Sequence, residues 1–186
     1  MWRAITITAA LVGLTLTSAP AGAQQVLSPY RDQQFTKIRG LTDAELGELK
    51  SGTGMGLARA AELNGYPGPR HVLDAVAAGQ LLVTPEQNRR VVEIFDEMAG
   101  RARSLGGQII TEETALEMAF RAGTIAETDL RRRVSRIAVL RGELRAVHLG
   151  AHLETRALLS AAQIGRYNEL RGYKADSEQP HNHQRH

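Results

Sequence analysis

The sequence predicts an all-α protein built on a long antiparallel helical hairpin, and three observations lead to this fold class. No stretch alternates apolar and polar residues over the length of a useful strand. Apolar residues instead recur at steps of three and four from Val91 to Ile109, and again from Leu130 to Ala151. This is the spacing of helices that pack along each other. Aromatic residues make up only 4% of the chain, which argues against a bulky central core.

Short helices should precede the hairpin. We expect them over 41–50, 54–63 and 71–78, with a turn at 64–69 because Asn-Gly-Tyr-Pro-Gly-Pro interrupts regular structure. The first long helix should run from Thr84 to Ala122, crossing a glycine pair at 106–107, and the second should begin at Thr124. A last helix should run from Ser160 to about Arg171. Such a thin hairpin buries one stripe per helix, and a homodimer is a natural way to cover the rest.

The N-terminus has the pattern of a secretory signal peptide. Arg3 precedes an apolar stretch, and the small residues Ala21-Gly22-Ala23 form a cleavage signal. The apolar stretch is too short and too rich in threonine for a membrane anchor, so we expect a mature protein in the periplasm with no transmembrane segment. The predicted divisions are a signal peptide at 1–23, a flexible lead-in at 24–40, one helical domain at 41–173 and a disordered tail at 174–186.

Composition and local motifs exclude several classes of function. The chain has no cysteine, which excludes disulfides, thiolate nucleophiles and cysteine metal sites. A formal charge of +3 with mixed signs argues against nucleic acid as a partner. The serines lack a nucleophile elbow, and the glycine-rich Ser51–Gly56 lacks the strand and lysine of a phosphate loop. We therefore expect a protein that is not an enzyme and requires no cofactor.

Four short sequences match the capping box, in which a Thr or Ser hydroxyl caps a helix and a Glu or Gln three residues later reaches back to the cap N–H. The two most similar boxes contain glutamine, and Pro85 at the first helical position favours one of them. The boxes are Thr42–Glu45, Thr84–Gln87, Thr124–Glu127 and Ser160–Gln163.

His148 and His152 are the strongest metal candidates, because residues four apart lie on the same face of a helix. A simple hairpin register places Met98 and Glu97 across from them. Two histidines with methionine would favour copper, whereas two histidines with a carboxylate would suit zinc or nickel. The alternative is that both histidines are half-buried polar residues beside the packed seam.

The C-terminal tail offers a second metal candidate. His181, His183 and His186 lie within six residues of one another. They would hold a metal weakly, since flexible ligands lose entropy on binding.

The chain resembles the Spy/CpxP family of periplasmic stress proteins and the related periplasmic heavy-metal sensor and resistance proteins. The resemblance rests on two boxes like the family's Leu-Thr-x-x-Gln motif, in a secreted, helical, cysteine-free chain. In this sequence Val83 replaces the leucine of the first box and Ser160 the threonine of the second. The matching segments are Val83-Thr84-Pro85-Glu86-Gln87 and Leu159-Ser160-Ala161-Ala162-Gln163.

The resemblance implies a thin, curved helical dimer. Some family members act as ATP-independent chaperones, and others bind metals and report to a signalling system. The leading hypothesis is therefore an envelope-stress protein that binds unfolded or partly folded clients. The alternative is a sensor or resistance accessory that binds copper, zinc or nickel and acts with an envelope signalling protein. A purely structural partner of another envelope protein is a third hypothesis.

Overall fold

The computed structural model describes residues 27–173. All regular structure in this part of the chain is helical, and no strand occurs in it, so the predicted all-α class is confirmed. The predicted signal peptide at 1–23, the lead-in residues before 27 and the tail histidines lie outside the described residues. The chain divides into two units, Met1–Asp32 and Gln33–His186, and the packing described below belongs to the second.

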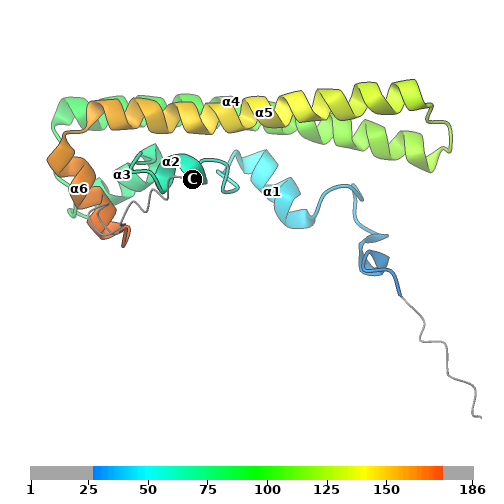
Figure 1. The fold of residues 1–186 in the computed structure, drawn as a ribbon, viewed down its shortest axis with the longest axis horizontal. Helices are drawn as coiled ribbons and strands as arrows, with labels where there is room; N and C mark the ends of the chain where they lie inside the picture. The colour runs from blue at the N-terminus through cyan, green and yellow to red at the C-terminus, as the bar shows by residue number, and fades with distance from the viewer. Residues whose placement is uncertain (1–26, 174–186) are drawn as a thin grey trace, which may run out of the picture. The chain divides into compact units, whose positions relative to one another are not determined.

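A long helix and a slightly shorter one dominate the fold, with short helices beside them (Figure 1). No helix within residues 27–173 combines the length and the apolar character needed to cross a membrane. The elements in chain order are the short 3-10 turn η1 (Arg31–Gln33), α1 (Asp43–Ser51), α2 (Arg59–Glu62), α3 (Pro69–Ala77), α4 (Pro85–Arg121), α5 (Glu127–Leu158) and α6 (Ala161–Leu170).

The two long helices lie side by side and run in opposite directions (Figure 1). Arg90 near the start of α4 lies 3.8 Å from Glu154 near the end of α5, and Arg136 donates to Gln108 at 3.2 Å further along. Apolar side chains fill the seam between them. One buried cluster joins this seam to α1 and the segment before it, and it contains Ile38, Leu41, Leu49, Ala102, Ile109, Leu140 and Leu144.

Packing begins inside the predicted lead-in. Ile38 is buried, and the backbone N–H of Arg39 donates to the Glu117 carboxylate on α4. The residues just before α1 therefore lie against the long helix.

Gly106 allows α1 to approach α4 closely. A Cβ atom at this position would lie 2.0 Å from the carbonyl oxygen of Leu49, far inside van der Waals contact. The neighbouring Gly107 faces open space, and α4 continues through both glycines without a break. Of the two glycines, only Gly106 is therefore needed for the close packing of α1 on α4.

The Thr124–Glu127 capping box is a wrong prediction. Helix α5 begins at Glu127 with Ala126 at its N-cap, and no side chain caps it. Thr124 instead closes α4, because its backbone N–H donates to the Ala119 carbonyl while Gly123 adopts a positive φ of 64°. This is a Schellman-type helix end, and it uses the residue that the pattern had assigned to the next helix start.

Candidate functional site: a glutamine clamp, a histidine recess and an uncovered helical surface

The two glutamine boxes form and meet each other in space. Thr84 accepts from the Gln87 N–H and Ser160 from the Gln163 N–H, and each glutamine Oε1 accepts from the backbone N–H of its own cap residue. Across the fold, Gln87 Nε2 donates to Gln163 Oε1 at 3.0 Å and Gln163 Nε2 donates to Gln87 Oε1 at 2.9 Å. We call this reciprocal pair the glutamine clamp.

The clamp is symmetric in its backbone contacts as well. Gln87 Nε2 donates to the Leu158 carbonyl at 2.7 Å, and Gln163 Nε2 donates to the Leu82 carbonyl at 2.9 Å. Each accepting carbonyl lies two residues before the cap residue of the opposite box. The repeated motif therefore ties the start of α4 to the junction between α5 and α6.

Beside the clamp, a second buried cluster holds α3 and α6 to α4. Its members are Val72, Leu81, Val91, Leu159 and Tyr167. Tyr167 is 1% exposed, and its hydroxyl accepts from the Gly68 N–H and donates to Glu62 Oε1 at 2.7 Å. Burial, and then the bond to the Glu62 carboxylate, raises the pKa of Tyr167.

Glu62 is the centre of a polar cluster that the sequence analysis missed. Besides Tyr167, its Oε1 accepts from Arg171 at 3.0 Å and from the Tyr173 hydroxyl at 3.2 Å. Its other oxygen is buried without a hydrogen bond and lies 3.7 Å from His152 Nδ1. No local pattern marks Glu62, because its partners lie about a hundred residues later in the chain.

The turn at 64–69 is fastened to α5. Arg156 donates to the Gly65 carbonyl, and its guanidinium lies over the Tyr66 ring at 4.6 Å. His152 Nδ1 lies 2.7 Å from the Tyr66 carbonyl oxygen. A carbonyl can only accept, so Nδ1 donates this hydrogen bond. The turn acts as a rigid connector rather than a free loop.

His148 is buried more completely than the sequence suggested. It is 3% exposed and His152 8% exposed, so both lie well inside the fold. His148 Nε2 is buried and has no hydrogen-bond partner in the described residues. Burial, and then the nearby His152, lowers the pKa of His148. At neutral pH this ring is therefore uncharged.

Both histidines line a recess of about 390 Å³, which we call the histidine recess. Its walls come from the 51–54 loop, the first turn of α3 and one face each of α4 and α5. His71 also lines it, although the sequence analysis treated that residue only as part of a helix start. The side chains used in the arguments below are Arg70, His71, Phe95, Met98, Arg103, His148 and His152.

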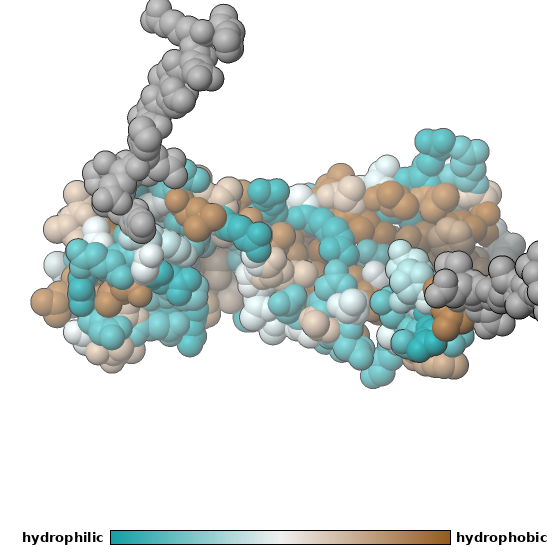
Figure 2. Space-filling model, turned by 60° about the horizontal axis from the view of Figure 1, so that its bottom comes forward, coloured by the Kyte–Doolittle hydropathy of each residue, from teal (hydrophilic) through white to brown (hydrophobic). Residues whose placement is uncertain are grey.

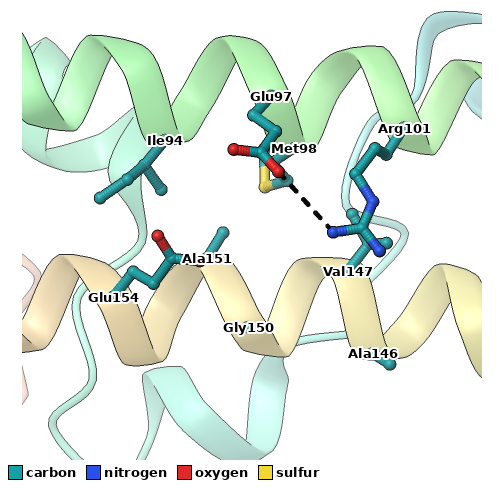
Figure 3. A pocket seen from close by; sticks show the side chains of 9 residues that line it. All are labelled: Ile94, Glu97, Met98, Arg101, Ala146, Val147, Gly150, Ala151 and Glu154. Carbon is teal, nitrogen blue, oxygen red and sulfur yellow. Dashed lines mark ion pairs between the residues drawn. The ribbon is translucent and has the colours of Figure 1, made fainter.

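Met98 and Glu97 are placed differently from each other. Met98 lines both the histidine recess and a small groove between α4 and α5, whereas Glu97 lines the groove but not the recess and pairs there with Arg101 at 3.9 Å. Figure 3 shows this groove, with Glu97 and Arg101 projecting from α4 and Glu154 from α5. The structure thus joins Met98, but not Glu97, to the two histidines.

The donor set around the histidines is sparse for a metal ion. Within residues 27–173, no group of three or more His, Asp or Glu side chains is arranged to hold a metal. His152 has Nε2 available, and this nitrogen packs against Gly68. The tail histidines lie outside the described residues. Metal binding through His148, His152 and Met98 stays a prediction.

The far half of α4 and α5, next to their connection, carries exposed apolar side chains. Helix α1 packs nearer the middle of α4, against Gly106, and Figure 2 shows hydrophobic residues gathered on this end. We call this the distal surface. Its large exposed side chains are Met118 at 65%, Phe120 at 56%, Val134 at 49% and Val139 at 51%.

The arginine run beside the distal surface is balanced by local ion pairs. Arg131 pairs with Glu127 at 2.6 Å, and Arg133 pairs with Asp129 at 2.8 Å. Arg132 also pairs with Asp129. These i,i+3 and i,i+4 pairs make the run a solvated helix face and leave the apolar side chains as the distinctive feature of this end.

Comparison with known proteins yields no relative. No protein-family model, no curated protein and no solved structure matches the chain.

Proposed function

We propose that this protein is a non-enzymatic periplasmic stress protein that binds unfolded or partly folded clients on the distal surface. The observation that carries the proposal is the set of large apolar side chains left uncovered on α4 and α5, with Met118 and Phe120 more than half exposed. Met118 and Phe120 point to different sides of α4, but Figure 2 shows hydrophobic residues gathered at this end, and exposed apolar patches are typical of sites that bind other proteins. The secretory leader predicted at 1–23 supports the periplasmic location.

The chemistry of this surface suits weak and unselective binding. Burial of apolar area contributes about 25 cal/mol per Å² and needs no particular geometry. Polar recognition groups are occupied locally: Glu117 bonds Arg39 and Arg121, and Asp129 bonds Arg132 and Arg133. A client would therefore be held by apolar contacts that it can exchange, without ATP.

A thin, curved, dimeric hairpin is the assembly that we propose for this function. The paired long helices bury one seam in a single chain, and a second copy would cover a further stripe along them. A paired surface would also present two sets of apolar side chains to one extended client, which strengthens binding without any new type of contact.

The test is suppression of aggregation of an unrelated unfolding protein by the mature chain, residues 24–186, without ATP and at near-stoichiometric ratio. Phe120→Ser should reduce suppression. Leu153→Ser is the matched control, because Leu153 is 58% exposed but lies on α5 away from the distal surface. Equal activity of both variants, or no suppression by the wild type at several-fold excess, would overturn the proposal.

The metal-binding alternative has one supporting observation, which is that Met98, His148 and His152 line the same recess. The other lining charges do not favour a cation, since Arg70 and Arg103 are both basic. Titration of a chain ending at Tyr173, which lacks the tail histidines, with copper, zinc or nickel ions separates this alternative from the client-binding proposal.

A further inference from the structure

We propose that the histidine recess binds a small organic anion with a flat apolar body, of the chemical class of an aromatic carboxylate. The first reason is the sign of its charges. The charged side chains that line the recess, Arg70 and Arg103, are both cations, and no Asp or Glu lines it. A concave site of one charge sign attracts ligands of the opposite sign.

The first turn of α3 gives a second source of positive potential. Its N-cap, Gly68, has no side chain to cap the helix, and Pro69 at the first position has no N–H. The backbone N–H groups of Arg70 and His71 therefore lack an acceptor inside the helix, as is general for a helix start. Because this nine-residue helix begins at the recess wall, its dipole also favours an anion there.

His148 supplies the independent observation of a built site. It is 3% exposed, and its Nε2 is buried without a hydrogen-bond partner in the described residues. Buried polar atoms are nearly always paired in folded proteins, so an unpaired one beside a recess indicates a missing partner. A carboxylate oxygen accepts from an imidazole N–H, and His148 has no other bond that would prevent this tautomer.

The apolar walls indicate an organic body rather than an inorganic ion. Phe95, Met98 and Ala99 of α4 line the recess together with Pro69. Arg70 lies over the Phe95 ring at 5.6 Å, which places a guanidinium beside an aromatic face. The volume of about 390 Å³ lies in the range of small-molecule sites, and a bare phosphate would leave these walls uncovered.

Arg103 is the charge most available to a ligand. Arg70 is already paired with Asp74 at 3.1 Å, whereas Arg103 forms no ion pair within residues 27–173. The competing explanation for the position of Arg103 is that it has a purely structural role. Its Cγ would lie 3.0 Å from a Cβ atom at Gly52, so it packs at the C-terminus of α1, where a cation is stabilising.

The experiment is an NMR titration of the isotope-labelled mature chain with benzoate. We expect saturable shifts at residues of the recess. Benzamide, which has the same shape without the charge, should bind at least tenfold more weakly, since a charged hydrogen bond contributes about that factor. Arg103→Gln should weaken benzoate binding by about the same factor. Arg101→Gln is the matched control, since Arg101 lies two residues away on the same helix and lines the other groove.

A second variant separates ligand binding from structure. His148→Phe keeps a flat ring but removes the nitrogen that we assign to the carboxylate. It should weaken benzoate binding, and its NMR spectrum should remain that of a folded protein. The inference is overturned by the absence of saturable shifts, by equal binding of benzoate and benzamide, or by equal loss in Arg101→Gln and Arg103→Gln. None of these outcomes bears on client binding, which uses the distal surface.

Discussion

Gln87 and Gln163, which are 76 residues apart, hydrogen-bond to each other through both atoms of their side-chain amides. Each oxygen also accepts from the N–H of its own cap residue, Thr84 or Ser160. A backbone N–H can only donate, so these bonds fix the orientation of both amides. The repeated motif thus does more than start two helices. It joins the two helix starts to each other.

Gln87→Glu should separate the capping role from the clamp. Glutamate still accepts from the Thr84 N–H, but it cannot donate to Gln163 or to the Leu158 carbonyl. Because the site is half-buried, we expect a loss of about 1–3 kcal/mol in the free energy of unfolding, measured by urea denaturation.

The matched control for the clamp is the reverse change in the Thr42–Glu45 capping box. Glu45 caps α1 through Thr42 and forms its hydrogen bonds only within its own box. Glu45→Gln should therefore change the free energy of unfolding by less than about 0.5 kcal/mol. Similar effects of the two substitutions would show that the cross-connection adds nothing to capping.

Substitution of the two adjacent glycines of α4 should change the free energy of unfolding in opposite directions. Gly106→Ala places a Cβ against the Leu49 carbonyl oxygen, so α1 must shift, and we expect a loss of about 1–3 kcal/mol. Gly107→Ala meets open space and should gain about 0.5–1 kcal/mol from helix propensity. Thermal melts of both variants test this directly, and a loss of equal size in both would contradict the assigned role of Gly106.

Local patterns in the sequence were sufficient to predict most of the helices, because each depends on its own periodicity and cap. Helix α4 was expected to begin at Thr84 and end at Ala122, and the structure has Pro85–Arg121 with those two residues as its caps. The Thr124–Glu127 capping box was a wrong prediction because two local motifs overlap there: the end of α4 and the predicted start of the next helix. Thr124 serves the end of α4.

The candidate sites depended on contacts between distant parts of the chain, which local patterns do not contain. The spacing of His148 and His152 predicted that they share a helix face. It could not show that the 64–71 segment covers them, that Glu62 approaches His152, or that Arg103 and His71 surround the same recess. A one-dimensional register predicted both Met98 and Glu97 across from the histidines, but only Met98 lines the histidine recess, because neighbours on a helix point in different directions.

The buried His148 should make stability depend on pH. Its pKa is lowered in the folded state because burial disfavours the charged ring. The unfolded chain therefore binds more protons than the folded chain once the pH falls below about 6.5, and stability decreases toward acid pH.

The test compares wild type with His148→Phe by urea denaturation between about pH 7.5 and pH 5.5, above the range where most carboxylates titrate. The variant should lose less stability over this interval, because it removes one group that must charge on unfolding. His71, whose pKa is also lowered by burial, leaves a residual slope. Parallel curves for the two proteins would rule out His148 as the source.

The last prediction concerns metal. We expect the mature chain to bind Cu(II), Ni(II) or Zn(II) weakly and through its tail, where His181, His183 and His186 lie close together in sequence. The helical pair is less suitable, since no third His, Asp or Glu joins it within residues 27–173 and Arg103 faces the same recess. A chain ending at Tyr173 should therefore lose metal binding in a calorimetric titration.

The opposite result would establish the helical site and favour the metal-sensor alternative. In that case the chain ending at Tyr173 keeps its affinity, and His148→Ala and His152→Ala each weaken it by roughly tenfold or more, because a chelate loses one imidazole. Met98→Leu would then weaken copper binding but have little effect on zinc, since a thioether is a soft ligand. Affinity would also fall at acid pH, because only neutral imidazole binds a metal.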